Sequence, residues 1–140
     1  MKKFLLSTMM VLVGVFAFAQ EKQAEISFEV MVHEFGTIIE GTQATVEFEF
    51  TNTGNAPLVL SSVSASCGCT TPEWTKEPIM PGQKGKIKAI YNSTGRVGSF
   101  TKSITVNSNA KNGTKILTIK GVVEAKPTAP TSPVQNKPNN

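Results

Sequence analysis

A strict alternation of apolar and polar side chains in the middle of the chain limits the possible folds more than any other feature. Residues 45–51 read TVEFEFT, so a valine and two phenylalanines alternate with glutamates and threonines. A period of two places successive side chains on opposite faces of a β-strand, whereas a helix needs a longer period. One face of this strand is therefore buried and the other faces water, as in the antiparallel sheets of a β-sandwich.

Shorter stretches with the same alternation recur through residue 123. They are separated by turns rich in glycine, proline and asparagine, at 52–55, 81–82, 92–95 and 109–113. We therefore predict an all-β fold, an immunoglobulin-like antiparallel β-sandwich of about seven strands. Its predicted core consists of side chains on the apolar faces of these strands: Phe35, Val46, Phe48, Phe50, Leu58, Leu60, Ile87, Ala89, Phe100, Ile104, Val106, Leu117 and Ile119.

The N-terminus has the composition of a secretory signal peptide. Lys2 and Lys3 precede an apolar run at 4–18, and Ala17-Phe18-Ala19 supplies the small residues of a cleavage site before Gln20. The run is shorter than the roughly 20 apolar residues that span a bilayer, so we expect cleavage in place of an uncleaved membrane anchor. The sequence thus predicts an exported protein with no stable membrane span after signal cleavage, located in the periplasm, on the cell surface or secreted.

We divide the chain into four parts. They are a signal peptide at 1–19, a short linker at 20–24, the immunoglobulin-like β-sandwich domain at 25–124 and a Pro-rich disordered tail at 125–140. The tail has four prolines after Lys126 and almost no side chain able to enter a core. About a hundred residues remain for the folded part, which suits one domain with a single hydrophobic core.

The charge of the chain is modestly basic. It has 14 Lys and Arg against 10 acidic residues, all of them glutamates, and loss of Lys2 and Lys3 with the signal peptide lowers the formal net charge from +4 to +2. Lys84, Lys86 and Lys88 alternate along one segment and are candidate surface-contact residues. They suit an anionic partner, or else form the solvent face of a strand protected against edge pairing. Nucleic acid is not an expected partner of an exported protein.

The residues offer no convincing catalytic constellation. The chain has no aspartate, and a Cys–His nucleophile would need His33 beside Cys67 or Cys69 with no evident third group to orient it. Glu47 and Glu49 lie on the wet face of their strand, where solvation explains them. We therefore expect no enzyme activity, no catalytic residue and no cofactor.

Several short motifs follow one another in a fixed order over 25–124. They are Phe35-Gly36, Phe50-x-Asn52-Thr53-Gly54, Pro57-Leu58, Ser66-Cys67-Gly68-Cys69-Thr70, Pro81-Gly82 and Ser108-Asn109. This ordered set resembles the bacterial domain-of-unknown-function family 1573. The family is similar to the sandwiches of the ASPM–SPD-2–Hydin group and to PapD-like domains. The resemblance implies an immunoglobulin-like fold and export, and it carries over no catalytic residue.

Cys67-Gly68-Cys69 contains the only two cysteines. We favour a disulfide or structural clip, because paired thiols oxidise in exported proteins and Gly68, as a turn residue, can bend the backbone enough to join them. Three alternatives stay open: free thiols in a local turn, a metal site in which Cys67 and Cys69 bind Cu(I), and redox catalysis. His33, Met31 and Met80 are the further candidate ligands, without diagnostic spacing.

Three further positions have specific interpretations. Trp74 either stacks on a sugar, together with Tyr91 and the lysines, or packs as a rim residue over the end of the sandwich. Gly36 is expected to let the chain cross between the sheets. Lys102 falls on the apolar face of its strand, which indicates an edge position or a snorkelling side chain.

The predicted function is that of an exported, non-enzymatic β-sandwich module, a protein-interaction or structural component of the cell envelope. Its partner would be an envelope or surface protein, and free strand edges are natural docking sites for an added strand. One alternative is a periplasmic copper- or thiol-handling protein that uses the Cys-Gly-Cys motif. Another is a carbohydrate-binding module with a glycan as its partner.

Overall fold

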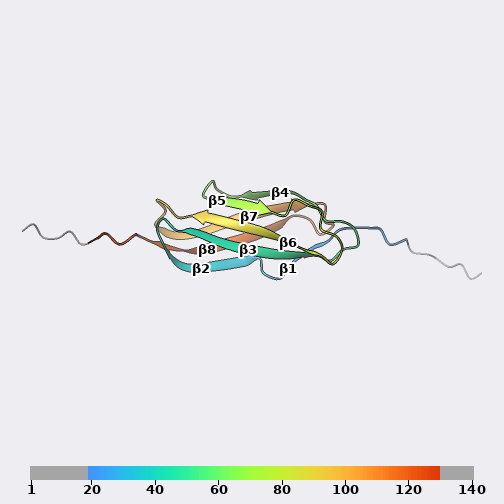
Figure 1. Cartoon of the computed structure of the whole chain (residues 1–140), viewed down its shortest axis with the longest axis horizontal. Helices are drawn as coiled ribbons and strands as arrows, with labels where there is room; N and C mark the ends of the chain where they lie inside the picture. Colours follow the sequence, from blue (N-terminus) through green and yellow to red (C-terminus); the bar gives the residue numbers. More distant parts are fainter. Residues whose placement is uncertain (1–18, 130–140) are drawn as a thin grey trace, which may run out of the picture.

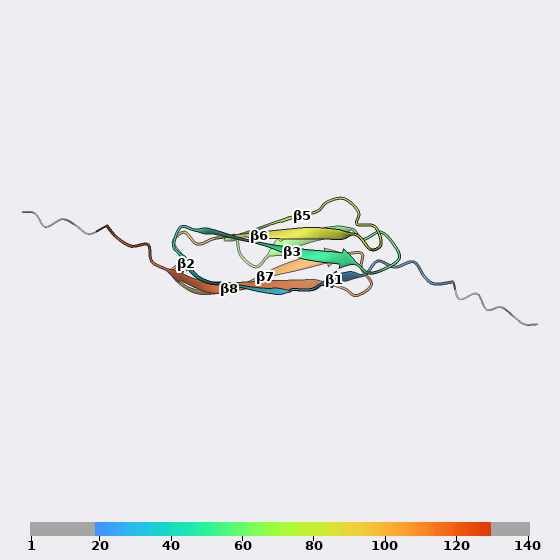
Figure 2. The ribbon, with the colours of Figure 1, turned by 60° about the horizontal axis from the view of Figure 1, so that its bottom comes forward.

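The computed structural model describes residues 19–129 and has eight strands in two sheets. The strands are β1 (Ile26–Phe28), β2 (Val32–Ile39), β3 (Gln43–Asn52), β4 (Leu60–Ala65), β5 (Thr70–Trp74), β6 (Lys84–Asn92), β7 (Gly98–Ser108) and β8 (Lys115–Glu124). Sheet A has the order β1-β3-β6-β5 and sheet B the order β2-β8-β7-β4. The sheets face each other as two layers (Figures 1 and 2), which confirms the predicted sandwich with one strand more than expected.

The described range omits most of the predicted signal peptide and the end of the predicted tail. Residues 1–18 and 130–140 lie outside it, and 125–129 follow β8 without regular structure. Within 19–129, no helix has both the length and the apolar character needed to cross a membrane. The described chain enters at one end of the sandwich and leaves at the other (Figure 1).

Sheet A is built from the alternating segment identified in the sequence. In the antiparallel pairing of β3 with β6, Val46 lies opposite Ala89 and Phe48 lies opposite Ile87. Phe48 is 2% exposed, whereas its neighbour Glu47 is exposed. The predicted register of this strand, apolar side inward and glutamates outward, is therefore confirmed.

Sheet B corrects two expectations. β2 runs parallel to β8 on both sides of Gly36, whose positive φ of 68° accompanies a bulge in that pairing. The chain instead crosses between the sheets before β2, at residues 29–31. The edge position expected for Lys102 is also wrong, because β7 lies between β8 and β4; the side chain is half-buried on the inward face.

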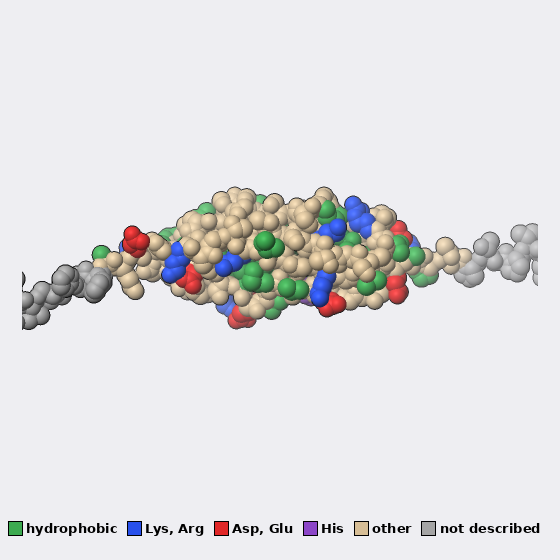
Figure 3. All heavy atoms as spheres, turned by 180° about the vertical axis from the view of Figure 1, so that it is seen from behind, with side chains coloured by type: hydrophobic (Ala, Val, Ile, Leu, Met, Phe, Trp, Pro, Cys, Tyr) green, Lys and Arg blue, Asp and Glu red, His purple; other side chains and the backbone are tan. Residues whose placement is uncertain are grey.

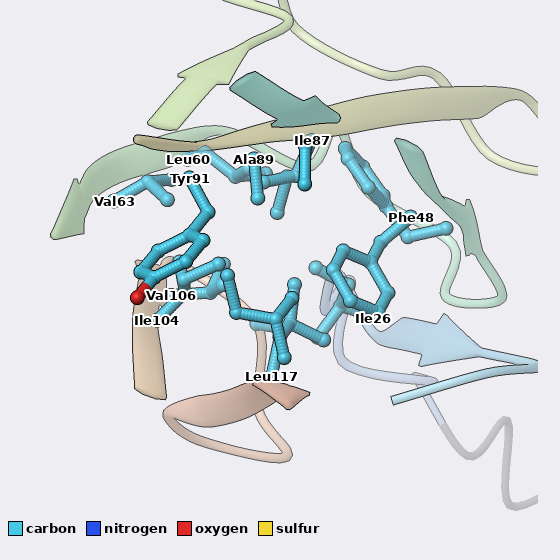
Figure 4. Packing of buried hydrophobic residues seen from close by; sticks show 14 of the residues in the cluster. Ile26, Phe48, Leu60, Val63, Ile87, Ala89, Tyr91, Ile104, Val106 and Leu117 are labelled. Atoms are coloured by element: carbon cyan, nitrogen blue, oxygen red, sulfur yellow. The ribbon is translucent and has the colours of Figure 1, made fainter. Parts of the chain in front are cut away.

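The core lies between the two inner faces. All predicted core residues are buried except Phe35 and Val46, which are half-buried. Figure 4 shows side chains of β3 and β6 pointing toward those of β7 and β8. At one end the ring of Tyr91 stacks on that of Phe100, with centroids 4.0 Å apart and an interplanar angle of 15°. The buried set extends beyond the prediction to residues such as Ile26, Val63 and Ile79.

A fully buried asparagine ties several chain segments together at the end of β3. The side-chain amide of Asn52 donates to the carbonyl oxygens of Ala56 and Ile79, at 2.7 and 2.8 Å. Its oxygen accepts from the backbone N–H groups of Gly54 and Glu25, at 3.0 and 3.4 Å. Because a buried amide is stable only when its polar atoms are bonded, this position fixes the approach to β1, the turn after β3 and the segment before β6.

Replacing Phe48 with alanine should destabilise the domain by roughly 3–5 kcal/mol, because a buried aromatic ring leaves a cavity. Glu47→Ala, next to it on the exposed face, should change stability by no more than about 0.5 kcal/mol. Urea denaturation of the two variants measures both values. Equal losses at the two positions would contradict the register of β3.

Asn52→Ala should cost about 3 kcal/mol, since it leaves one buried and three partly buried backbone groups without their hydrogen-bond partner. Asn92→Ala is the matched control: its side chain is exposed and accepts one hydrogen bond, from the N–H of Thr94. The control should cost at most about 1 kcal/mol. Thermal unfolding followed by circular dichroism compares them, and a silent Asn52→Ala would show that the amide does not hold the strand ends.

Candidate functional site

The connection between β4 and β5 carries the two cysteines. Cys67 and Cys69 are joined as a disulfide with their Cα atoms 5.3 Å apart. Cys69 is buried in the core cluster, and Cys67 is half-buried against it. The hydroxyl of Thr70 lies 4.0 Å from the sulfur of Cys67 and 3.9 Å from that of Cys69. The pair therefore packs against the core at the place where the chain passes from one sheet to the other.

The structure shows which backbone conformation Gly68 adopts between the two cysteines. Gly68 is a turn residue, but it is not among the glycines with positive φ. A Cβ atom at this position would have no other atom within 4 Å. The turn between the cysteines thus closes without a conformation reserved for glycine.

The further candidate ligands lie apart from the cysteines. His33 is on β2, and the cysteines follow β4, the opposite edge of sheet B. Three strand spacings separate these edges, or about 14 Å. Met80 is an exposed residue between β5 and β6. Among residues 19–129 no three His, Cys, Asp or Glu side chains converge on a metal position. Sulfurs joined in a disulfide are not thiolates, so a Cu(I) site would first require reduction.

The three lysines of β6 form ion pairs across the outer face of sheet A. Lys84 Nζ lies 2.7 Å from a carboxylate oxygen of Glu49, Lys86 Nζ lies 3.1 Å from Glu47, and Lys88 Nζ lies 3.8 Å from Glu73. The hydrogen bond from Lys84 lowers the pKa of Glu49, and the same bond raises the pKa of Lys84. An anionic partner would have to compete with these carboxylates. β6 is an inner strand of its sheet, so protection of an edge does not explain the lysines.

Trp74 lies at the rim of the sandwich. It pairs with the buried Ile87, and its indole packs half-buried against the core. The ammonium of Lys76 lies 2.9 Å from the centroid of the ring system, so a sugar stacking on that face would have to displace it. The indole Nε1–H is buried with no acceptor among the described residues.

Tyr91 is not available for a surface contact. It is 1% exposed, and burial raises the pKa of its phenol. The expected grouping of Tyr91 with Trp74 and the lysines on one surface is therefore wrong. A shallow surface hollow does bring Trp74 together with Lys86 and Lys88.

The outer face of sheet B differs from that of sheet A. Hydroxyl-bearing and aliphatic side chains dominate it: Ser62, Ser64, Ser99, Thr101, Ser103, Thr105, Val32, Ile116 and Val122. Among the described residues, one ion pair bridges β8 and β2 on this face, Lys120 with Glu34 at 3.6 Å. Figure 3, the view from behind, shows the middle of the face as largely neutral, with hydrophobic side chains grouped on it.

The side of the sandwich between β2 and β3 is incompletely closed. β1 pairs with β3 only from Phe50 to Asn52, so no strand of the described range pairs with the outer edge of β3 at 43–49. Five apolar side chains lie half-buried near this edge: Phe28, Met31, Phe35, Ile38 and Val46. We call this set the edge strip. Val46 is half-buried although Ala89, its neighbour on β6, is fully buried.

Sequence reasoning did not find the edge strip. The predicted core includes Phe35 and Val46, because alternation identifies the inward face of a strand but not the strands beside it. The structure supplies the missing information: β1, Ile26–Phe28, is too short to cover the whole of β3, Gln43–Asn52. His33 also lies here, with its ring 4.6 Å from that of Phe35 in an edge-to-face arrangement.

A match to a protein-family model shows to which family the chain belongs. Residues 26–123 match the model of a family described as a protein of unknown function, DUF1573. The chain belongs to this family. The resemblance inferred from the ordered motifs is thus confirmed over nearly the whole folded domain. No curated protein matches the sequence.

Solved structures similar to this DUF1573 domain share its fold. A protein of unknown function from Porphyromonas gingivalis W83 has a TM-score of 0.65 at 17% identity, covering 78% of this chain and 51% of that one. The PapD-like domain 7 of human CEP192 has a TM-score of 0.63 at 9% identity, covering 75% and 89%. The secreted serine protease VesC from Vibrio cholerae has a TM-score of 0.54 at 17% identity, covering 71% and 23%.

These likenesses establish the fold and no more. The DUF1573 chain spans about half of the Porphyromonas structure and about a quarter of VesC. At such low identity the activity of a neighbour is not transferable, because one sandwich fold supports many functions. The established description is a DUF1573 domain with an immunoglobulin-like, PapD-like sandwich fold.

The double variant Cys67→Ser with Cys69→Ser should remain folded, with a melting temperature lower by only a few degrees. So short a loop contributes little chain entropy, and a loss of about 1–2 kcal/mol is expected. Gly68→Ala should be almost silent. The control Gly54→Ala should be clearly destabilising, because its Cβ would collide with the backbone of Gln23. Thermal unfolding tests all three; a large rise in the melting temperature of the reduced protein with Cu(I), dependent on the cysteines, would support the copper alternative instead.

Proposed function

We propose that this protein is an exported, non-enzymatic module that binds another protein of the cell envelope or surface. The observation that carries the proposal is the open side of the sandwich, where the edge strip is half-buried and the edge of β3 is unpaired. Apolar side chains and free backbone groups at one place are what a protein partner can cover. Export rests on the signal-peptide pattern of residues 1–19.

The two alternatives receive less support from the described residues. Copper or thiol handling needs Cys67 and Cys69 as thiolates, and both sulfurs are engaged in the disulfide and packed on the core. Glycan binding at Trp74 would displace the ammonium of Lys76 and would lack Tyr91, which is buried. The proposal of a non-enzymatic role likewise rests on the distance between His33 and the cysteines and on the lack of aspartate.

Site-specific photo-crosslinking in the producing cell tests the proposal. A photoreactive residue in place of Thr45, which is exposed on the unpaired part of β3, should give a discrete adduct with one envelope protein. The same residue at Thr101, on the outer face of sheet B, and at Thr71, exposed on β5, are the controls and should give none. N-terminal sequencing of the purified adduct should begin within a residue or two of Gln20.

Three results would contradict the proposal. A chain that retains Met1 would exclude cleavage and export as described. The absence of a discrete adduct from position 45 would show that the open side is not the binding site. An adduct from position 101 alone would show that the partner binds the outer face of sheet B.

A further inference from the structure

The sandwich has several strand edges, and only one is both long and regular. β1 has three residues. The pairing of β2 with β8 is interrupted between Glu34 and Thr37, and that of β4 with β7 between Leu60 and Ser62. β5 carries Pro72. Bulges, prolines and short length are the usual protections against strand addition. Residues 43–49 of β3, which pair with β6 without interruption, have none of them.

The direction of the hydrogen bonds shows which backbone groups of β3 are free. Asn52 donates its N–H to Gln83 and accepts from the N–H of Gly82, so its backbone groups face the β6 side. Thr53 donates to Glu25, on the opposite side. Backbone N–H and C=O groups point to opposite edges in successive residues of a strand. Even-numbered residues of β3 therefore face β6, and the backbone groups of Thr45 and Glu47 face away from it. No partner for these groups lies among residues 19–129.

The same alternation explains the proline in β5. Cys69 accepts from the N–H of Asn92, and Thr75 donates to Lys86, so odd-numbered residues of this strand face β6. The missing N–H of Pro72 therefore falls on the outer edge, where it removes a donor that an added strand would use. One edge of sheet A is thus blocked and the other is not.

The side chains around the free edge of β3 determine which kind of added strand could bind there. On the inner side, the edge strip offers apolar surface to every second residue of an added strand. On the outer side, Glu47 and Glu49 project from β3, with side chains 52% and 49% exposed. Their lysine partners lie on β6, away from the free edge, so a cation on an added strand can approach from the other side. Oppositely charged residues facing each other across strands stabilise a pair.

We infer that the free edge of β3 at 43–49 binds an extended segment of a partner protein as an additional strand of sheet A. Apolar residues alternate in this segment with basic ones: the apolar side chains cover the edge strip and the basic ones face Glu47 and Glu49. The inference rests on the proposed binding function and adds the binding mode and the chemistry of the partner.

Two other occupants fit the edge less well. A second copy paired through β3 would place the glutamates of both copies close together, and like charges across strands destabilise the pair. The chain's own C-terminal segment begins after Glu124, and Pro127 and Pro130 recur within it. Proline lacks the N–H that strand pairing requires.

Synthetic peptides test the inference on the full mature chain. The probe is the capped peptide KVKIKVK, and its charge-reversed control is EVEIEVE. Isothermal titration calorimetry should show binding of the first and at least about tenfold weaker binding of the second. Hydrogen exchange at the amides of Thr45 and Glu47 should slow when KVKIKVK binds.

Backbone N-methylation separates strand addition from general apolar contact. Methylating either only the lysine positions or only the apolar positions of the probe removes the N–H groups on one edge of the peptide. One set should abolish binding and the other should leave it nearly unchanged, because only one edge of the peptide pairs with β3. The lysine set is expected to abolish binding if the added strand is antiparallel.

Matched protein variants give the complementary test. Thr45→Pro removes the free N–H and should weaken binding about tenfold or more, whereas Thr45→Ala keeps it and should not. Glu47→Lys should weaken binding of KVKIKVK, and Glu73→Lys, the same charge change on β5, should not. If Thr45→Pro fails to fold, the N-methylated peptides with the natural chain decide the question.

Four results would overturn the inference: equal effects of the two N-methylated peptides, protection of sheet B in place of β3, dimerisation of the free protein through β3, and tighter peptide binding after removal of 125–140. Each is distinguishable from failure of the proposed function, which is read from the crosslinks in the cell. An adduct from position 45, together with peptides whose binding does not depend on N-methylation, would leave the binding function and refute only the strand addition.

Discussion

The buried amide of Asn52 is the interaction on which the arrangement of this sandwich depends. It bonds to Gly54 and Ala56 in the turn after β3 and to Glu25 and Ile79, each 27 residues away, so three chain segments converge on one side chain. The backbone of 23–25 passes so close to Gly54 that a Cβ atom would not fit. Because a buried polar group is costly without partners, this end of the sandwich has little freedom to rearrange.

The same anchoring accounts for the open side. The first strand is held against β3 only where Asn52 fixes it, and three residues later the chain leaves for the other sheet. β2 then joins β8 in parallel, and the rest of β3 has no neighbour on that side within the described range. A half-buried edge strip and an unpaired backbone follow from splitting the N-terminal segment between two sheets.

Elsewhere on the described domain, the charged groups of sheet A, its β5 edge and the cysteines have partners or are blocked. The outer face of sheet A is covered by cross-strand ion pairs, and its β5 edge is blocked by Pro72. The disulfide between Cys67 and Cys69 packs on the core beside the connection from β4 to β5. The chemical features that stand out in the sequence, the cysteines and the lysines of β6, therefore have structural partners, and the edge strip is made of ordinary apolar residues.

The sequence by itself determined the all-β class, the inward faces of Phe48 and Ile87, most of the core and the family. Alternation and turn residues are local signals, so they can be read from neighbouring residues alone. Only the tertiary structure decided that Lys102 lies on an inner strand and that Val46 borders an open edge. Which strands become neighbours depends on contacts between segments far apart in the chain, and alternation carries no information about them.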